Sequence, residues 1–346
     1  MHHLAKEIIS IEASPVIPSV LGTSREGREI EGYRFGSGDF KISLIGGCHA
    51  DEPVGPAFLR KLVCYFSSLT ETNQLLRNFS WWIVPHANPD GEINNSQWIL
   101  PESESYDPVK YLQYVVREKP GEDVEFGFPV DDHDSGARPE NWTISHWWQT
   151  ESNTPFHLHV SLHGMGFAAG PWHLIEPAWE HDCDVFMEEC RRNWEQLGYL
   201  PHDVERQGDK GFRRLGRGFC TRPDSGEMKK YFLGKGDKKT AALFRPSSME
   251  VIRSLGGNPL TLVSEMPLFI TPGVGECLGP PDPVGEMWKK EITRWQVMAR
   301  TEEKRLQLAS AMKNLKLKPM PVSHQMELQW GMIIAGIRQL KKTGYS

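Results

Sequence analysis

Residues 41–53 read KISLIGGCHADEP, and this stretch predicts the end of a buried strand followed by the start of a helix. Its first part is a short, continuous apolar run, which is typical of a central strand buried on both faces. A pair of glycines then lets the backbone turn closely, and Pro53 suits the first turn of a helix. His49 and Glu52 stand at this junction, where side chains of an α/β sheet point into an open crevice.

Two interpretations of His49 and Glu52 are open at this point. An imidazole and a carboxylate that emerge together can share one metal ion. They can equally belong to a helix cap, with Asp51 as the N-cap residue and Glu52 favoured in the first turn by the helix dipole. A short motif of this kind decides nothing until its structural context agrees.

The rest of the chain alternates between strand and helix patterns. The apolar, β-rich runs cover residues 41–47, 80–88, 157–164 and 260–269. Helical patterns follow Pro53, cover residues 177–197 and begin again near residue 283. This alternation predicts an α/β fold with a central mixed, mostly parallel sheet flanked by helices. The long polar stretches 101–141 and 203–240 are expected to be functional loops over the strand ends.

Bulk properties narrow the class of protein. The chain has 346 residues and a net charge of −6, whereas a nucleic-acid-binding protein normally has a basic face. Neither the N-terminus nor any later stretch has the apolar run of a signal peptide or a membrane span. Six cysteines in a chain of this length do not form a disulfide framework. We therefore expect a soluble, cytoplasmic protein without nucleic-acid or membrane partners, and we predict no oligomeric state.

Two further chemically distinctive residues follow core strands. His163 lies in SLHG, where we expect it to end its strand, and Glu265 lies in VSEM between apolar neighbours. The strand ends of an α/β sheet share one crevice, so both side chains can converge with His49 and Glu52. Two histidines and a glutamate are the ligands of many catalytic zinc sites, and a further carboxylate suits a general base. The alternative for His163 is a solvent-exposed polar strand face.

Five motifs in register resemble the zinc carboxypeptidase family. They are LGTSREGREIEGYRFGSG (21–38), GGCHADEP (46–53), HANPDG (86–91), SLHG (161–164) and LVSEMP (262–267). The resemblance extends from about residue 15 to 275. It implies a sheet of about eight strands, with His49, Glu52 and His163 binding one Zn²⁺ per chain and Glu265 acting as general base.

The arginines depart from the family pattern. The arginine expected about a dozen residues after Asn-Pro-Asp-Gly is missing, and so is the usual Asn-Arg pair that grips the substrate carboxylate. The nearest substitute is GARPENW (136–142), where Arg138 and Asn141 offer a forked cation and an amide. A loop salt bridge is the alternative for Arg138. Further candidates that the sequence does not rank are Arg213, Arg214, Arg217 and Arg222.

The predicted function is zinc-dependent hydrolysis of an amide bond beside a substrate carboxylate, most simply release of a C-terminal residue from a peptide. One alternative is a zinc deacylase that acts on N-acyl amino acids or cell-wall peptides. The other is an inactive metal-binding scaffold. Residues 1–282 are expected to form the catalytic domain, and residues 283–346 a C-terminal helical extension packed on the same domain.

Overall fold

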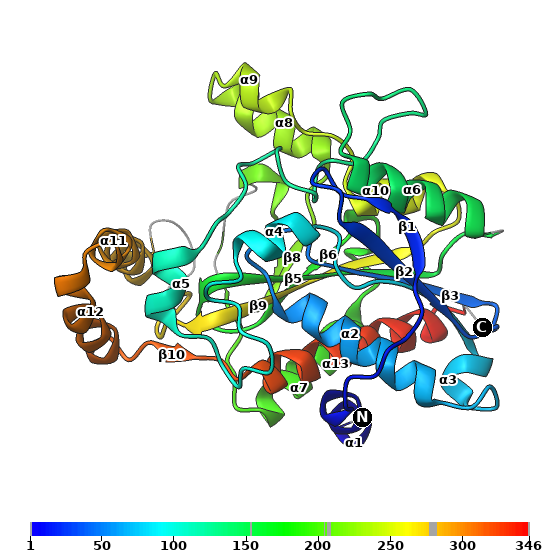
Figure 1. Cartoon of the computed structure of the whole chain (residues 1–346), viewed down its shortest axis with the longest axis horizontal. Helices are drawn as coiled ribbons and strands as arrows, with labels where there is room; N and C mark the ends of the chain where they lie inside the picture. Colours follow the sequence, from blue (N-terminus) through cyan, green and yellow to red (C-terminus); the bar gives the residue numbers. More distant parts are fainter. Residues whose placement is uncertain (1, 153, 204, 206–208, 277–281, 345–346) are drawn as a thin grey trace.

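The computed structural model describes residues 2–152, 154–203, 205, 209–276 and 282–344 (Figure 1). Its strands are β1 Ser19–Thr23, β2 Glu29–Phe35, β3 Phe40–Gly46, β4 Phe79–Val84, β5 Leu158–Ala168, β6 Trp172–Ile175, β7 Arg214–Gly216, β8 Phe219–Thr221, β9 Leu260–Ile270 and β10 Lys318–Pro319. Its α-helices are α1 His2–Ser10, α2 Val54–Ser68, α3 Gln74–Arg77, α4 Pro89–Asn94, α5 Pro108–Tyr114, α6 Pro139–Glu151, α7 Asp184–Gln196, α8 Ser225–Gly234, α9 Lys238–Ala241, α10 Ser248–Ser254, α11 Pro283–Ala299, α12 Glu302–Asn314 and α13 Val322–Lys342.

The strands form one mixed sheet in the order β1-β2-β4-β3-β5-β9-β6-β8-β7, with β10 paired to β9. The central pairs β4–β3, β3–β5 and β5–β9 are parallel, and antiparallel pairs lie on both sides of them. The predicted mixed sheet flanked by helices is confirmed. The described residues contain ten strands instead of about eight. Three of the ten, β7, β8 and β10, have only two or three residues each and leave no apolar run in the sequence.

Helices cover both faces of the sheet (Figure 1). The larger core lies on the face covered by α1, α2, α7 and α13, and α2 contributes Phe58, Leu62 and Phe66 to it. The opposite face packs against α6 and α10 through a second cluster that includes Trp148 and Ile252. Both faces of the central strands are therefore buried, which explains why these strands read as continuous apolar runs.

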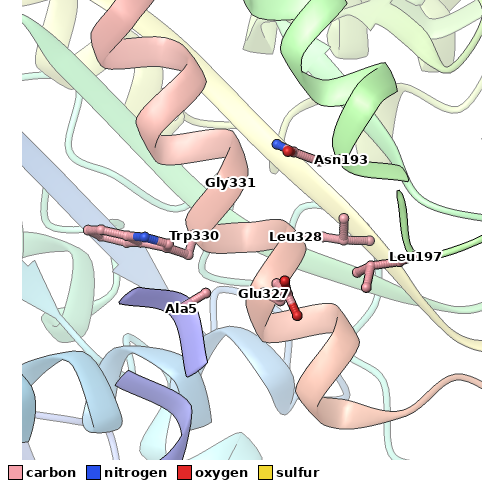
Figure 2. Close-up of a pocket in the computed structure, with 7 residues that line it drawn as sticks. All are labelled: Ala5, Asn193, Leu197, Glu327, Leu328, Trp330 and Gly331. Atoms are coloured by element: carbon pink, nitrogen blue, oxygen red, sulfur yellow. The ribbon is translucent and has the colours of Figure 1, made fainter. Parts of the chain in front are cut away.

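The C-terminal region contacts the sheet directly. The helices α11 and α12 lie beside α5 at one end of the molecule, β10 adds to β9, and α13 packs against α7, α2 and β9. Where α13 meets α7 and α1, Gly331 allows a close approach, because a Cβ there would lie 2.6 Å from Asn193 Nδ2 (Figure 2). Only a cavity of about 10 Å³ is left at this junction. The division of the chain at residue 282 stays a prediction.

The two long polar stretches contain regular structure. Residues 101–141 include α5, and residues 203–240 include β7, β8, α8 and most of α9. In Figure 1, α8 and α9 project from the sheet beyond α6 and α10. Short helices and strands therefore interrupt the loops expected in both stretches, and each stretch contributes residues near the candidate site described below.

The Asn-Pro-Asp-Gly turn is tied to the turn between β1 and β2. Asp90 accepts hydrogen bonds from Ser24 Oγ at 2.6 Å, Arg28 Nη1 at 2.6 Å and the backbone N–H of Glu26 at 3.1 Å. Burial raises the pKa of Asp90, but the hydrogen bonds from Ser24 and Arg28 outweigh it and hold that pKa below its ordinary value. Two sequence motifs that lie more than sixty residues apart therefore form one structural unit.

We predict that Asp90→Asn lowers the free energy of unfolding by about 1.5–3 kcal/mol at neutral pH, because it removes charged hydrogen bonds from a buried group. Since the folded-state pKa of Asp90 is depressed, the difference from wild type should be full above about pH 4 and decrease as the pH falls through that pKa. Urea unfolding at several pH values measures it. Asp107→Asn at the exposed N-cap of α5 is the control, because Asn caps a helix as well as Asp.

Candidate metal centre

The candidate site lies where β5 and β9 extend beyond the end of β3. The last residue pair between β3 and β5 is Gly46–Leu162, and β5 and β9 remain paired beyond it to Ala168–Ile270. His163 is thus the first residue of β5 without β3 beside it. The expectation that His163 ends its strand is wrong, because the space at His163 comes from the end of β3. The sheet continues from β3 to β4 on one side and to β5 on the other, which is where α/β folds bind ligands.

The turn after β3 positions His49 and Glu52. Gly47 has φ +69°, and a Cβ there would lie 2.4 Å from His86 Nδ1, so a side chain is excluded. The helix α2 begins at Val54 after Pro53, and no side chain caps it. The helix-cap interpretation of Asp51 and Glu52 is therefore wrong. Both carboxylates precede the helix, and Glu52 is buried.

Three side chains aim their donor atoms at one point. His49 Nδ1 lies 2.8 Å from Glu52 Oε1, and His163 Nδ1 lies 2.9 Å from Glu52 Oε2. The two Nδ1 atoms are 3.2 Å apart. Ligand atoms of a tetrahedral zinc ion lie roughly 3.3 Å from one another, because each is about 2.0–2.1 Å from the metal. The donor set and its spacing therefore fit zinc.

The cluster attracts positive charge even without a metal. Burial lowers the pKa of both imidazoles, but Glu52 raises the pKa of His49 to about 9, and Glu125 with Glu52 raises that of His163 well above its ordinary value. Burial alone would raise the pKa of Glu52, yet the two histidines hold it well below the usual range. The carboxylates around the two imidazoles thus favour a positive charge at the place that a divalent cation would fill.

Glu265 lies next to the cluster on the neighbouring strand. It is the direct partner of His163 across the parallel pair β5–β9, so the two side chains leave the sheet on the same face. Burial, followed by the charge of Glu52, raises the pKa of Glu265 to about 8. A carboxylate with a high affinity for protons beside a metal-ligand set is suited to proton transfer.

A second group of polar atoms surrounds the other nitrogen of His163. Its Nε2 lies 2.7 Å from Ser161 Oγ and 3.1 Å from Glu125 Oε2. Cys48 belongs to the same group, since its sulfur lies within 4.8 Å of donor atoms on His163 and Glu125. Arg222, only 2% exposed, donates from Nη2 to Glu125 Oε1 at 2.7 Å. Glu125 belongs to none of the motifs that predicted the site.

The predicted carboxylate clamp lies in a dense structural network. Arg138 is 5% exposed and donates to Glu118 Oε1 at 2.6 Å and to both carboxylate oxygens of Glu140. Asn141 is fully buried and donates to the backbone carbonyl of Val124 at 2.8 Å. The guanidinium of Arg138 thus already has two carboxylate partners. A role of Arg138 and Asn141 in substrate binding stays a prediction.

Arg117 was not identified from the sequence, yet it lies beside the candidate ligand Glu52. Its side chain is 52% exposed, with Nη2 3.7 Å from Glu52 Oε1 and Nη1 3.5 Å from Asp51 Oδ2. It also lowers the pKa of Glu265 by its charge. Arg117 follows the Asn-Pro-Asp-Gly turn at a longer distance along the chain than the family pattern led us to expect.

An α/β sheet with two imidazoles and a carboxylate that converge beyond the end of a central strand defines a candidate metal-dependent hydrolase. The family model for zinc carboxypeptidases matches residues 11–237, and the chain therefore belongs to the zinc carboxypeptidase family. The matched segment includes His49, Glu52 and His163 but ends before Glu265.

Individual relatives are similar over shorter segments. The chain is 30% identical over 99 residues to "Inactive metallocarboxypeptidase ecm14" of Talaromyces marneffei, and 30% identical over 82 residues to "Zinc carboxypeptidase A 1" of Drosophila melanogaster. These matches cover 25% and 21% of this chain but only 17% and 19% of those relatives. The crystal structure of a metallo-carboxypeptidase from Burkholderia cenocepacia aligns with a TM-score of 0.50 and 13% identity, over 99% of this chain and 69% of that one, which shows the shared fold.

None of the helices in the described ranges combines the length and the apolar character that a membrane span requires. The cytoplasmic location expected from the sequence stays a prediction.

Zinc content tests the metal centre. We expect the purified protein to carry about one zinc ion per chain and His163→Ala to lose most of it, because a ligand facing both Glu52 and His49 is removed. His146→Ala, on the exposed side of α6, is the matched histidine control and should keep its zinc. Elemental analysis after dialysis gives the stoichiometry. Full zinc retention in both His49→Ala and His163→Ala would contradict the assignment.

Proposed function

We propose that this protein is a zinc-dependent hydrolase that cleaves an amide bond beside a substrate carboxylate, most simply as a carboxypeptidase. The observation that supports it most directly is the convergence of His49, Glu52 and His163 at one point, with Glu265 beside His163 on the adjacent strand. Membership of the zinc carboxypeptidase family supports the same reaction class. The substrate is a peptide or acylated amino acid with a free carboxylate.

Each residue has a separate role in this proposal. His49, Glu52 and His163 hold the zinc ion. When bound, zinc supplies Lewis acidity, which polarises a carbonyl and lowers the pKa of water toward about 7. The carboxylate of Glu265 accepts a proton and returns it to the leaving amine, and its burial favours the protonated form between these steps.

Arg117 docks the substrate in this proposal. Its guanidinium is half exposed and adjoins Glu52, so it can reach a carbonyl or carboxylate oxygen beside the metal ligands. The guanidinium of Arg138 is enclosed by Glu118 and Glu140, and that of Arg222 by Glu125. An arginine with exposed N–H groups is the better donor to an incoming ligand, and the contacts of Arg117 with Asp51 and Glu52 are longer than these enclosed pairs.

An inactive scaffold is the second candidate function, and one specific observation favours it. A matched relative carries the name of an inactive metallocarboxypeptidase. A third possibility, zinc deacylation of N-acyl amino acids, uses the same metal centre with a different substrate clamp. A panel of free and C-terminally amidated peptides together with N-acyl amino acids separates the three, because only the scaffold binds zinc and hydrolyses none of them.

Glu265→Gln separates a general base from a ligand. Glutamine keeps the shape of the side chain but accepts no proton, so we expect zinc and substrate to bind nearly as in wild type. The kcat should fall by about 10²–10⁴, which is the usual contribution of general acid–base catalysis. Steady-state kinetics and zinc content are measured on the same preparation. Loss of zinc would make Glu265 a ligand, and retained activity would place the base elsewhere.

Arg117→Lys and Arg138→Lys test the two candidate clamps. Each keeps the charge but loses the planar fork. We expect Arg117→Lys to lower kcat/KM for peptides with a free carboxylate by about tenfold or more, corresponding to loss of one charged hydrogen bond, with a much smaller effect on the amidated peptides. The same selective loss in Arg138→Lys alone would transfer the role to Arg138. If Arg138 only holds loops together, its variant loses unfolding stability without a change in selectivity.

A further inference from the structure

We propose that Glu125 is a positioning residue for His163: its carboxylate, held by Arg222, keeps the proton of the imidazole on Nε2, so that the Nδ1 lone pair faces Glu52 and His49. This inference rests on the proposed zinc site. No sequence motif identified Glu125. The inference gives a role to the buried ion pair between Glu125 and Arg222, which the proposed reaction does not otherwise use.

The tautomer of His163 decides which of its two nitrogens can bind a metal ion. A neutral imidazole carries its proton on one nitrogen and a lone pair on the other, and a metal binds the lone pair. His163 Nδ1 faces Glu52 Oε2 at 2.9 Å and His49 Nδ1 at 3.2 Å, so this nitrogen belongs to the metal side. The proton must then lie on Nε2. Ser161 Oγ at 2.7 Å and Glu125 Oε2 at 3.1 Å are the acceptors around Nε2.

Glu125 lies next to the nitrogen that carries this proton. A carboxylate that is only 6% exposed is costly unless it is paired. Its Oε1 accepts from Arg222 at 2.7 Å, whereas Oε2 has no hydrogen-bond partner with good geometry among the described residues and lies 3.1 Å from His163 Nε2. The unsatisfied oxygen therefore adjoins the nitrogen that has to carry the proton. Ser161 supplies a neutral acceptor there, and Glu125 supplies the negative charge.

Arg222 is anchored in turn by further buried polar side chains. Its Nη2 also donates to Ser248 Oγ at 3.0 Å, and Ser248 Oγ lies 2.9 Å from His159 Nε2. The other nitrogen of His159 lies 3.1 Å from Ser43 Oγ on β3. All of these residues are buried. The polar chain fixes Arg222 and hence Glu125 from behind, which is how partners of metal-binding histidines fix ring orientation.

Glu125→Gln is a sharp probe, because both neighbours of the carboxylate are donors. A carboxamide must turn its NH₂ group toward either Arg222 Nη2 or His163 Nε2, so one of the two interactions becomes repulsive. We expect zinc affinity, measured by competition with a chelator of known affinity, to fall about 10–100-fold. Glu125→Asp keeps the charge on a shorter side chain and should recover part of this loss.

Asp203→Asn is the matched control. Asp203 is also 6% exposed and pairs with an arginine, Arg214, through two hydrogen bonds of 3.0 Å, but it is not part of the cluster around His163. It should lose unfolding stability in urea and keep wild-type zinc affinity. If Glu125 were only a structural counter-ion, Glu125→Gln would behave in the same way, and zinc affinity within about threefold of wild type would overturn the proposal.

Two further outcomes would also overturn it. Equal zinc affinities in Glu125→Gln and Glu125→Asp would show that the negative charge of Glu125 does not contribute to zinc binding. Two zinc ions per wild-type chain, with one lost in both Glu125→Gln and Cys48→Ala, would make Glu125 a direct ligand of a second ion.

Failure of the proposed function is separate: a wild-type protein that binds zinc but hydrolyses no substrate contradicts the catalytic proposal and leaves the role of Glu125 intact. A wild-type protein that binds no zinc contradicts both.

Discussion

The structure of the site depends on one constraint, which is the early end of β3. This strand stops at Gly46, while β5 and β9 run side by side for several more residues. The backbone turns at a glycine with positive φ and starts α2 only after Glu52. As a result, the turn places His49 and Glu52 beside the two paired strands that carry His163 and Glu265. The ligands thus come from elements whose relative positions are fixed by buried apolar strands.

The site also holds several carboxylates that are largely removed from water. Glu52, Glu125 and Glu265 lie close to one pair of histidines, and two of these carboxylates are less than a tenth exposed. Buried carboxylates require compensating charge, since their removal from water costs several kcal/mol each. Arg222 compensates Glu125 from one side, and the imidazoles of His49 and His163 compensate Glu52 from the other. A divalent cation between the histidines would satisfy the same requirement while leaving both imidazoles neutral.

Much of this arrangement was predictable from the sequence, for local reasons. The four core strands and α2 have continuous apolar runs or a helical stripe that depend only on neighbouring residues. The short strands β7, β8 and β10 are defined by pairing with distant residues and leave no such pattern. Arg117 belongs to no motif and reaches Glu52 only through the fold. Glu125 had one recognisable sign, an acid between Val124 and Phe126, which is the same sign that drew attention to Glu265.

In the proposed function, the metal centre of the family is combined with a different substrate clamp. Arg138 and Arg222 are both buried, and each is paired with carboxylates of its own chain, so their charges already contribute to holding loops and His163 in place. Arg117 is half exposed, but Asp51 and Glu52 lie within 4 Å of its guanidinium and offset much of its charge.

Recognition of a substrate carboxylate at such a site rests less on net attraction than on the directed N–H groups that remain exposed. A planar fork supplies those groups with fixed geometry, whereas an ammonium does not. The chemistry that distinguishes peptidase from deacylase thus lies in the donors around the metal ligands, because both reactions can use the same ligands and the same base.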